Sequence, residues 1–216
     1  MHKKLSMGLT FGFISNVLFI CFGFISYIFY KTYMEGTAYS KGMEIFAYIV
    51  EISGFAAAVY SAVMLWITMR MRKTLKIMYT LYIVLEAVLM YMELNVDYHY
   101  GGYRPFSLAL AIAHAIVSAI VCFSFLQLDP DRTALEVVII ICSGIILGGM
   151  MGNFLGIRIY FSIITNAVSF TILFYMVKRL LDREEIEIDC HGDRARVAEY
   201  NGKEVFFGLK SENKKK

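Results

Sequence analysis

The chain has 216 residues, of which 58% are hydrophobic and 18% charged, and its formal net charge is +3. A soluble domain carries roughly 45–50% apolar residues and about 25% charged ones, so this composition argues against an ordinary soluble protein. The small net charge argues against nucleic-acid binding, and the apolar residues fall in long runs, which is typical of an integral membrane protein.

Six apolar runs reach the length of about 20 residues that a helix needs to cross the hydrocarbon core of a bilayer. The sequence therefore predicts an all-α membrane domain over residues 1–183, built as a six-span helical bundle. The predicted spans lie, in chain order, near residues 7–30, 43–68, 74–93, 107–127, 134–156 and 158–180.

Basic residues in the short connections between the spans predict the orientation, because such residues favour the cytoplasmic side. One side collects Lys3, Lys4, Arg70, Arg72, Lys73, Lys76, Arg132, Lys178, Arg179 and Arg183, and the other only Lys31, Lys41, Arg104 and Arg158. We therefore expect a multi-pass protein of the cell membrane (an inner membrane), with both termini in the cytoplasm.

Small residues mark predicted packing faces. In the fifth run, glycines recur four residues apart, which lets two helix backbones approach closely in lipid. They are Gly144, Gly148, Gly152 and Gly156, and the first run adds Gly8 and Gly12. These faces serve either the bundle itself or a homo-oligomer.

Three ionisable residues interrupt the apolar runs. Glu51, Glu86 and His114 each lie seven or eight residues inside the predicted external end of their span. At 1.5 Å per residue this places all three about 10–12 Å deep, and Asn166 of the last run joins the same layer. Glu44 lies one heptad before Glu51, and Glu93 lies one heptad after Glu86. We expect these two carboxylates to form an entry step to the layer from the external side.

Charged groups in hydrocarbon are costly, and by default they mark a functional site. The leading hypothesis is that the protein binds and passes a small cationic solute or a proton through an externally open cavity lined by carboxylates. In this role Glu51 and Glu86 take the charge, His114 relays protonation and Asn166 orients the ligand. This is transport rather than enzymatic catalysis, and the residues identify no cofactor.

Three alternatives stay open at this point. The chain could be a sensor or regulatory module that signals through its tail to a cytoplasmic protein. It could be an intramembrane metalloenzyme, with Glu51, Glu86 and His114 as ligands of a divalent ion. The polar layer could also hold the helices together by hydrogen bonds alone.

The last part of the chain, residues 184–216, has a different pattern. Two alternating stretches, 185–189 and 194–200, are separated by a predicted turn at 191–193, and Asn201-Gly202 favours a hairpin before 203–207. The pattern predicts a small cytoplasmic β-hairpin-like tail. About 25 residues cannot bury an independent core, so we expect the tail to pack on the membrane domain, a partner protein or a second copy.

Overall fold

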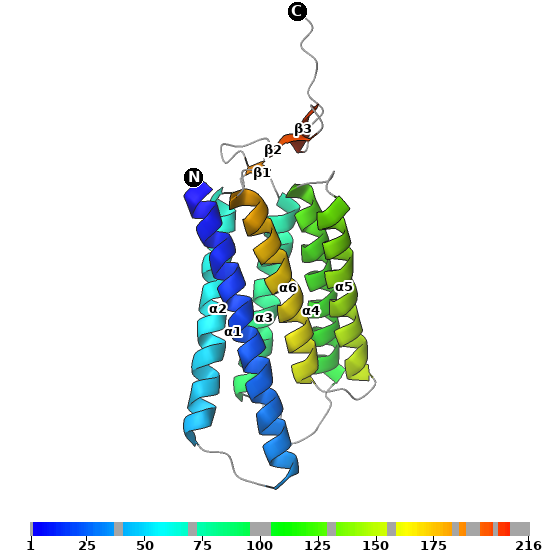
Figure 1. Ribbon diagram of the computed structural model, residues 1–216. Helices are drawn as coiled ribbons and strands as arrows, with labels where there is room; N and C mark the ends of the chain where they lie inside the picture. Colours follow the sequence, from blue (N-terminus) through cyan, green and yellow to red (C-terminus); the bar gives the residue numbers. More distant parts are fainter. Residues whose placement is uncertain are drawn as a thin grey trace, which may run out of the picture.

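The computed structural model describes residues 2–36, 41–68, 73–95, 105–128, 133–154, 159–182, 186–188, 195–200 and 203–207. Within these ranges the chain forms six long helices that pack side by side in one bundle (Figure 1). Each helix overlaps one of the predicted apolar runs. They are α1 (His2–Met34), α2 (Lys41–Thr68), α3 (Lys73–Asn95), α4 (Pro105–Ser124), α5 (Thr133–Phe154) and α6 (Ile159–Asp182). A short 3₁₀ turn, Phe125–Leu128, follows α4.

The six helices close into a ring. Each helix packs against the next one along the chain, and α6 returns to pack along α1. Helix α1 begins, and α6 ends, at the same end of the bundle (Figure 1), which we call the terminal end. We call the opposite end, where α1 meets the connection to α2, the far end.

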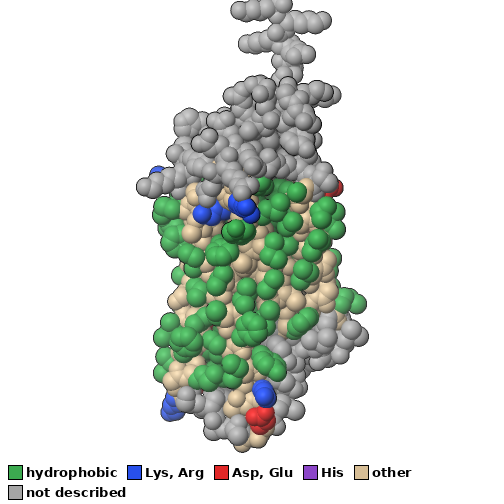
Figure 2. All heavy atoms as spheres, viewed as in Figure 1, with side chains coloured by type: hydrophobic (Ala, Val, Ile, Leu, Met, Phe, Trp, Pro, Cys, Tyr) green, Lys and Arg blue, Asp and Glu red, His purple; other side chains and the backbone are tan. Residues whose placement is uncertain are grey.

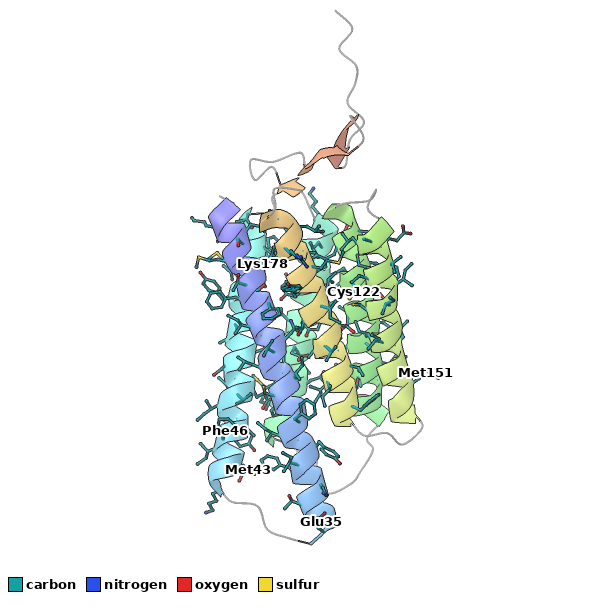
Figure 3. The ribbon with its side chains drawn as sticks, in the orientation of Figure 1. Glu35, Met43, Phe46, Cys122, Met151 and Lys178 are labelled. Carbon is teal, nitrogen blue, oxygen red and sulfur yellow. The ribbon has the colours of Figure 1, made fainter. Side chains whose placement is uncertain are left out.

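The outer surface of the bundle is apolar. Figure 2 shows hydrophobic side chains covering the middle of one face, with charged side chains toward its two ends. Glu35 lies at the far end of α1 and Lys178 near the terminal end of α6 (Figure 3). Large side chains such as Phe24 (55% exposed) face outward, and a soluble monomer rarely exposes apolar surface on this scale.

Five stretches within these helices are long and apolar enough to cross a membrane. Over the residues that the structure describes, the fourth predicted span supplies a shorter apolar stretch, Ala109–Ser124. The five longer stretches are Lys4–Phe29, Lys41–Thr68, Lys73–Tyr91, Ala134–Met151 and Phe161–Leu181. The fold is therefore that of a multi-pass membrane protein with an all-helical bundle.

The interior is filled by side chains from all six helices. Its largest fully buried members are aromatic, namely Phe125, Phe170 and Phe174, and they pack with aliphatic residues of every helix in one continuous cluster. A second, smaller cluster joins α1 and α2 toward the far end, around Phe22 and Val50. The buried polar residues discussed below must therefore find partners inside a tightly packed core.

Close helix approaches occur at glycines, but only partly at the predicted ones. The prediction for α1 is confirmed: a Cβ atom on Gly8 would lie 2.8 Å from Cβ of Met64, and one on Gly12 would lie 2.5 Å from Cε1 of Phe174. These contacts bring α2 and α6 against α1.

In α5 the described part of the predicted stripe, Gly144 and Gly148, faces away from the bundle. A Cβ atom on Gly144 or Gly148 would meet nothing within 4 Å, whereas one on Gly149 would overlap Oγ1 of Thr165 in α6. The packing role predicted for Gly144 and Gly148 is thus corrected within this bundle. The four-residue spacing identifies a face of the helix but cannot say to which neighbour that face is turned. Gly152 lies in α5 with no described surroundings, and Gly156 lies outside the described residues.

Polar side chains also join neighbouring helices. Oγ of Ser169 shares its one hydroxyl proton between the carbonyl of Thr165 in its own helix, at 2.8 Å, and the carbonyl of Cys142 in α5, at 3.2 Å. Sγ of Cys142 donates to the carbonyl of Ser169 at 3.4 Å. On the other side of the bundle, Oγ of Ser15 donates to the carbonyl of Gly54 at 2.7 Å. These bonds fix the register of α5 against α6 and of α1 against α2.

Replacing Ser169 by alanine should lower the free energy of unfolding by about 0.6 kcal/mol, the average for a hydrogen bond between membrane helices. Ser124→Ala is the control, because Oγ of Ser124 donates only within its own helix, to Ile120. The measurement is unfolding by sodium dodecyl sulfate in mixed micelles. Equal losses in the two variants would contradict a specific contribution from the bond between α5 and α6.

Beyond α6 the described residues include three short strands. They are β1 (Ile186–Ile188), β2 (Ala195–Tyr200) and β3 (Lys203–Phe207), paired antiparallel in the order β1-β2-β3. In the register, Ile186 pairs with Val197, and Val197 with Val205. Both predicted turns, 191–193 and 201–202, lie outside the described residues. What the tail packs against remains a prediction.

Candidate functional site

A carboxyl group and an imidazole meet inside the bundle. Glu86 comes from α3 and His114 from α4, and Oε2 of Glu86 lies 2.5 Å from Nε2 of His114. Only 17% of the glutamate side chain and 13% of the histidine side chain are exposed. The two atoms are close but not aligned for a hydrogen bond, because Nε2 of His114 makes no well-formed hydrogen bond with the described residues. Two ionisable groups predicted to share a layer are therefore in direct contact.

The pair can hold one proton on either of its two groups. With one proton, the pair exists either as a carboxylate beside an imidazolium or as a carboxylic acid beside a neutral imidazole. In both forms the pair carries no net charge, so it can lie in an apolar environment at moderate cost. Removal of that proton, or addition of a second, leaves an uncompensated charge that needs another partner.

Tyr82 connects this pair to α6. Its ring packs against the imidazole of His114, with the ring centroids 5.0 Å apart. Its hydroxyl is within hydrogen-bonding reach of the side chain of Asn166. Oδ1 of Asn166 is buried and has no well-formed hydrogen bond among the described residues. Side chains from α3, α4 and α6 therefore converge at one site.

Three residues of this environment were not predicted: Tyr82, Tyr79 and Ser61. The hydroxyl of Tyr79 is within reach of Ser61 in α2, whose own Oγ is buried without a well-formed hydrogen bond among the described residues. The sequence does carry a pattern that indicates the tyrosines. Tyr79, Tyr82 and Glu86 recur at intervals of three and four residues, which places them on one face of α3.

Glu51 lies apart from the Glu86–His114 pair. Its side chain is buried, on the face of α2 that packs against α1, since Gly54 one turn later contacts Leu18 and Phe19. None of the hydrogen bonds, ion pairs or ring contacts that the described structure gives Glu86 or His114 involves Glu51. The structure therefore brings Glu86 and His114 together, and Asn166 close to them through Tyr82, but gives Glu51 no contact with the pair.

The predicted entry step is described only in part. Glu44 lies in the first turn of α2 and is partly exposed. Glu93 lies in α3, but its side chain is outside the described part of the structure. The proposed pairing of these two carboxylates stays a prediction.

No three metal-binding side chains meet in the described ranges. Among the His, Cys, Asp and Glu residues found there, no group of three or more lies close enough to hold a metal ion. The suggested ligand set of Glu51, Glu86 and His114 is therefore not assembled among the described residues. Two ligands alone do not make a zinc site of the usual kind, which has at least three protein ligands.

In comparisons with protein-family models, with curated proteins and with solved structures, the chain matches none of them. The class of the molecule follows from its own fold and surface, which are those of an integral multi-pass membrane protein. Its candidate site is the buried contact between Glu86 and His114.

Proposed function

We propose that the protein binds a proton or a small cation at the Glu86–His114 pair and passes it across the membrane. The observation that carries this proposal is the 2.5 Å contact between two largely buried ionisable groups on apolar helices. Ionisable residues at such positions line ion and proton pathways in membrane proteins. The cavity open to the outside, the cell membrane as location and the cytoplasmic position of both termini belong to the same proposal.

The pair has the properties that such a role requires. The two groups sit on different helices, so a small shift of α3 against α4 changes their separation and their affinity for a proton. The carboxylate supplies the negative charge for a cation, and a ring nitrogen of the imidazole can accept or donate a proton. Asn166 and Tyr82 add polar atoms that can orient a bound ion.

The experiment is flux into proteoliposomes. Purified protein is reconstituted with a pH-sensitive dye inside, and a potassium diffusion potential drives uptake; radiolabelled methylammonium is the second probe, for a small organic cation. The wild type should exceed protein-free liposomes with at least one probe. Glu86→Gln should reduce that flux to the protein-free level, because the amide can neither carry the charge nor exchange the proton.

Glu136→Gln is the matched control, since it makes the same chemical change at an exposed position in the first turn of α5. It should keep the wild-type flux. Wild-type flux in Glu86→Gln, or no flux of either probe in the wild type, would refute the proposal. If the pair has only a structural role, Glu86→Gln should lose folded protein and the wild type should show no flux of either probe.

A further inference from the structure

Beside the pair, four aromatic rings from α3 and α6 pack against one another. Tyr79 and Tyr82 of α3 precede Glu86, and Phe170 and Phe174 of α6 follow Asn166, so along their helices these four residues lie nearer to the terminal end than Glu86 and Asn166. We call these four residues the aromatic layer. Neighbouring centroids are separated by 5.8 Å (Tyr79–Tyr82), 5.1 Å (Tyr82–Phe170), 6.3 Å (Phe170–Phe174) and 5.9 Å (Phe174–Tyr79).

The aromatic layer is packed as core. Phe170 and Phe174 are fully buried and the two tyrosines are 3% exposed, with Phe125 against Phe174 at 5.6 Å. Rings at these separations are in van der Waals contact. Sodium with its hydration shell, or an organic cation, would have to force them apart, whereas a proton needs only oxygen atoms on which to move.

Such oxygens are present inside the layer. The Tyr82 hydroxyl is adjacent to Asn166, and the Tyr79 hydroxyl, one turn closer to the terminal end, is adjacent to Ser61. Oδ1 of Asn166 and Oγ of Ser61 are both buried and both lack a well-formed hydrogen bond within the described ranges. Each tyrosine hydroxyl therefore has beside it a buried polar side chain with spare bonding capacity.

We propose that the ion bound at the Glu86–His114 pair is a proton, and that the Tyr82 hydroxyl carries it into the aromatic layer toward the terminal end. The inference rests on the proposed function and names its cargo. The hydroxyl oxygen of Tyr82 accepts a proton from the pair and passes its own proton on toward the hydroxyl oxygen of Tyr79, which in turn passes its proton to Oγ of Ser61, so both tyrosines end neutral. Rotation of the two hydroxyls resets them.

This assigns separate roles to the ring and to the hydroxyl of Tyr82. The ring, with Phe170, excludes ions larger than a proton. The hydroxyl lets the proton through. Tyr82→Phe keeps the ring and removes the hydroxyl, whereas Phe170→Ala leaves the hydroxyl and opens the layer.

The test uses the same proteoliposomes. Wild-type protein should carry protons and exclude sodium and methylammonium. Tyr82→Phe should lower proton flux by at least about tenfold, the lower range for loss of a positioned proton-transfer group, and Tyr79→Phe should lower it in the same direction. Tyr175→Phe, which removes a hydroxyl from an exposed position on α6, should behave as the wild type. Phe170→Ala should gain uptake of methylammonium.

Wild-type uptake of methylammonium or sodium at the proton rate would overturn the inference, and this measurement needs no variant. Undiminished proton flux in folded Tyr82→Phe would also overturn it. In that case, loss of flux in Glu86→Gln would leave the proposed function standing, so the two failures are distinguishable.

Discussion

Replacing Glu86 by leucine should destabilise the protein by about 3 kcal/mol, whereas replacing Glu86 and His114 together should cost much less. The single variant leaves a buried imidazole whose partner at 2.5 Å is gone. The double variant removes both polar groups and substitutes apolar side chains in an apolar core. Loss of one member of a buried pair is costly chiefly because of the group left behind.

A double-mutant cycle measures this coupling. Glu86→Leu, His114→Leu and the double variant are compared with the wild type by unfolding in mixed micelles at neutral pH. Glu136→Leu serves as the control, because an exposed carboxylate in a first helical turn contributes less than about 1 kcal/mol. Additive losses in the cycle would show that the two groups do not interact, and the assignment of the site would fall with them.

The second large effect concerns a glycine. Gly149→Val should prevent the recovery of folded protein, because even its Cβ atom would clash with Oγ1 of Thr165 in α6. Overpacking a well-filled core typically costs about 1–3 kcal/mol, and here the helix backbones themselves must separate. The readout is the yield of monodisperse protein in detergent, together with the temperature at which it aggregates.

Gly144→Val is the matched variant in the same helix. A Cβ atom there meets nothing within 4 Å, so yield and aggregation temperature should stay at the wild-type values. Equal damage at the two positions would contradict this arrangement of α5. If Gly144→Val changes only the oligomeric state, a second copy of the chain packs on that face, as the glycine spacing allows for a homo-oligomer.

Element by element, the helices were the most predictable part of this chain. Apolar length alone indicates a span, and the helix beginning at Lys41 and ending at Thr68 departs from the predicted 43–68 by two residues at one end. The contact between Glu86 and His114 was foreshadowed by their common depth. Depth was sufficient there because α3 and α4 are consecutive and antiparallel neighbours.

Depth alone does not decide whether Glu51 faces the same site. Two residues at one level meet only if their helices also rotate them toward each other, and rotation depends on which neighbours pack on each face. Gly54 fits against Leu18 and Phe19 and thereby turns this side of α2 to α1. The same missing information is why the spacing of Gly144 and Gly148 could not say which neighbour their face contacts. Tyr82 escaped notice for another reason, since a tyrosine in an apolar run resembles ordinary core until its neighbours are known.

The closure of the helix ring has a consequence for how the protein is made. A ribosome delivers α1 first and α6 last, and domains are completed in that order during synthesis. Until α6 enters the membrane, the groove at Gly12 that receives Phe174 is uncovered, and Tyr82 lacks both Asn166 and Phe170. Nascent and truncated chains therefore expose a site without Asn166 and an aromatic layer without Phe170 and Phe174. Membrane quality control can recognise them by that surface.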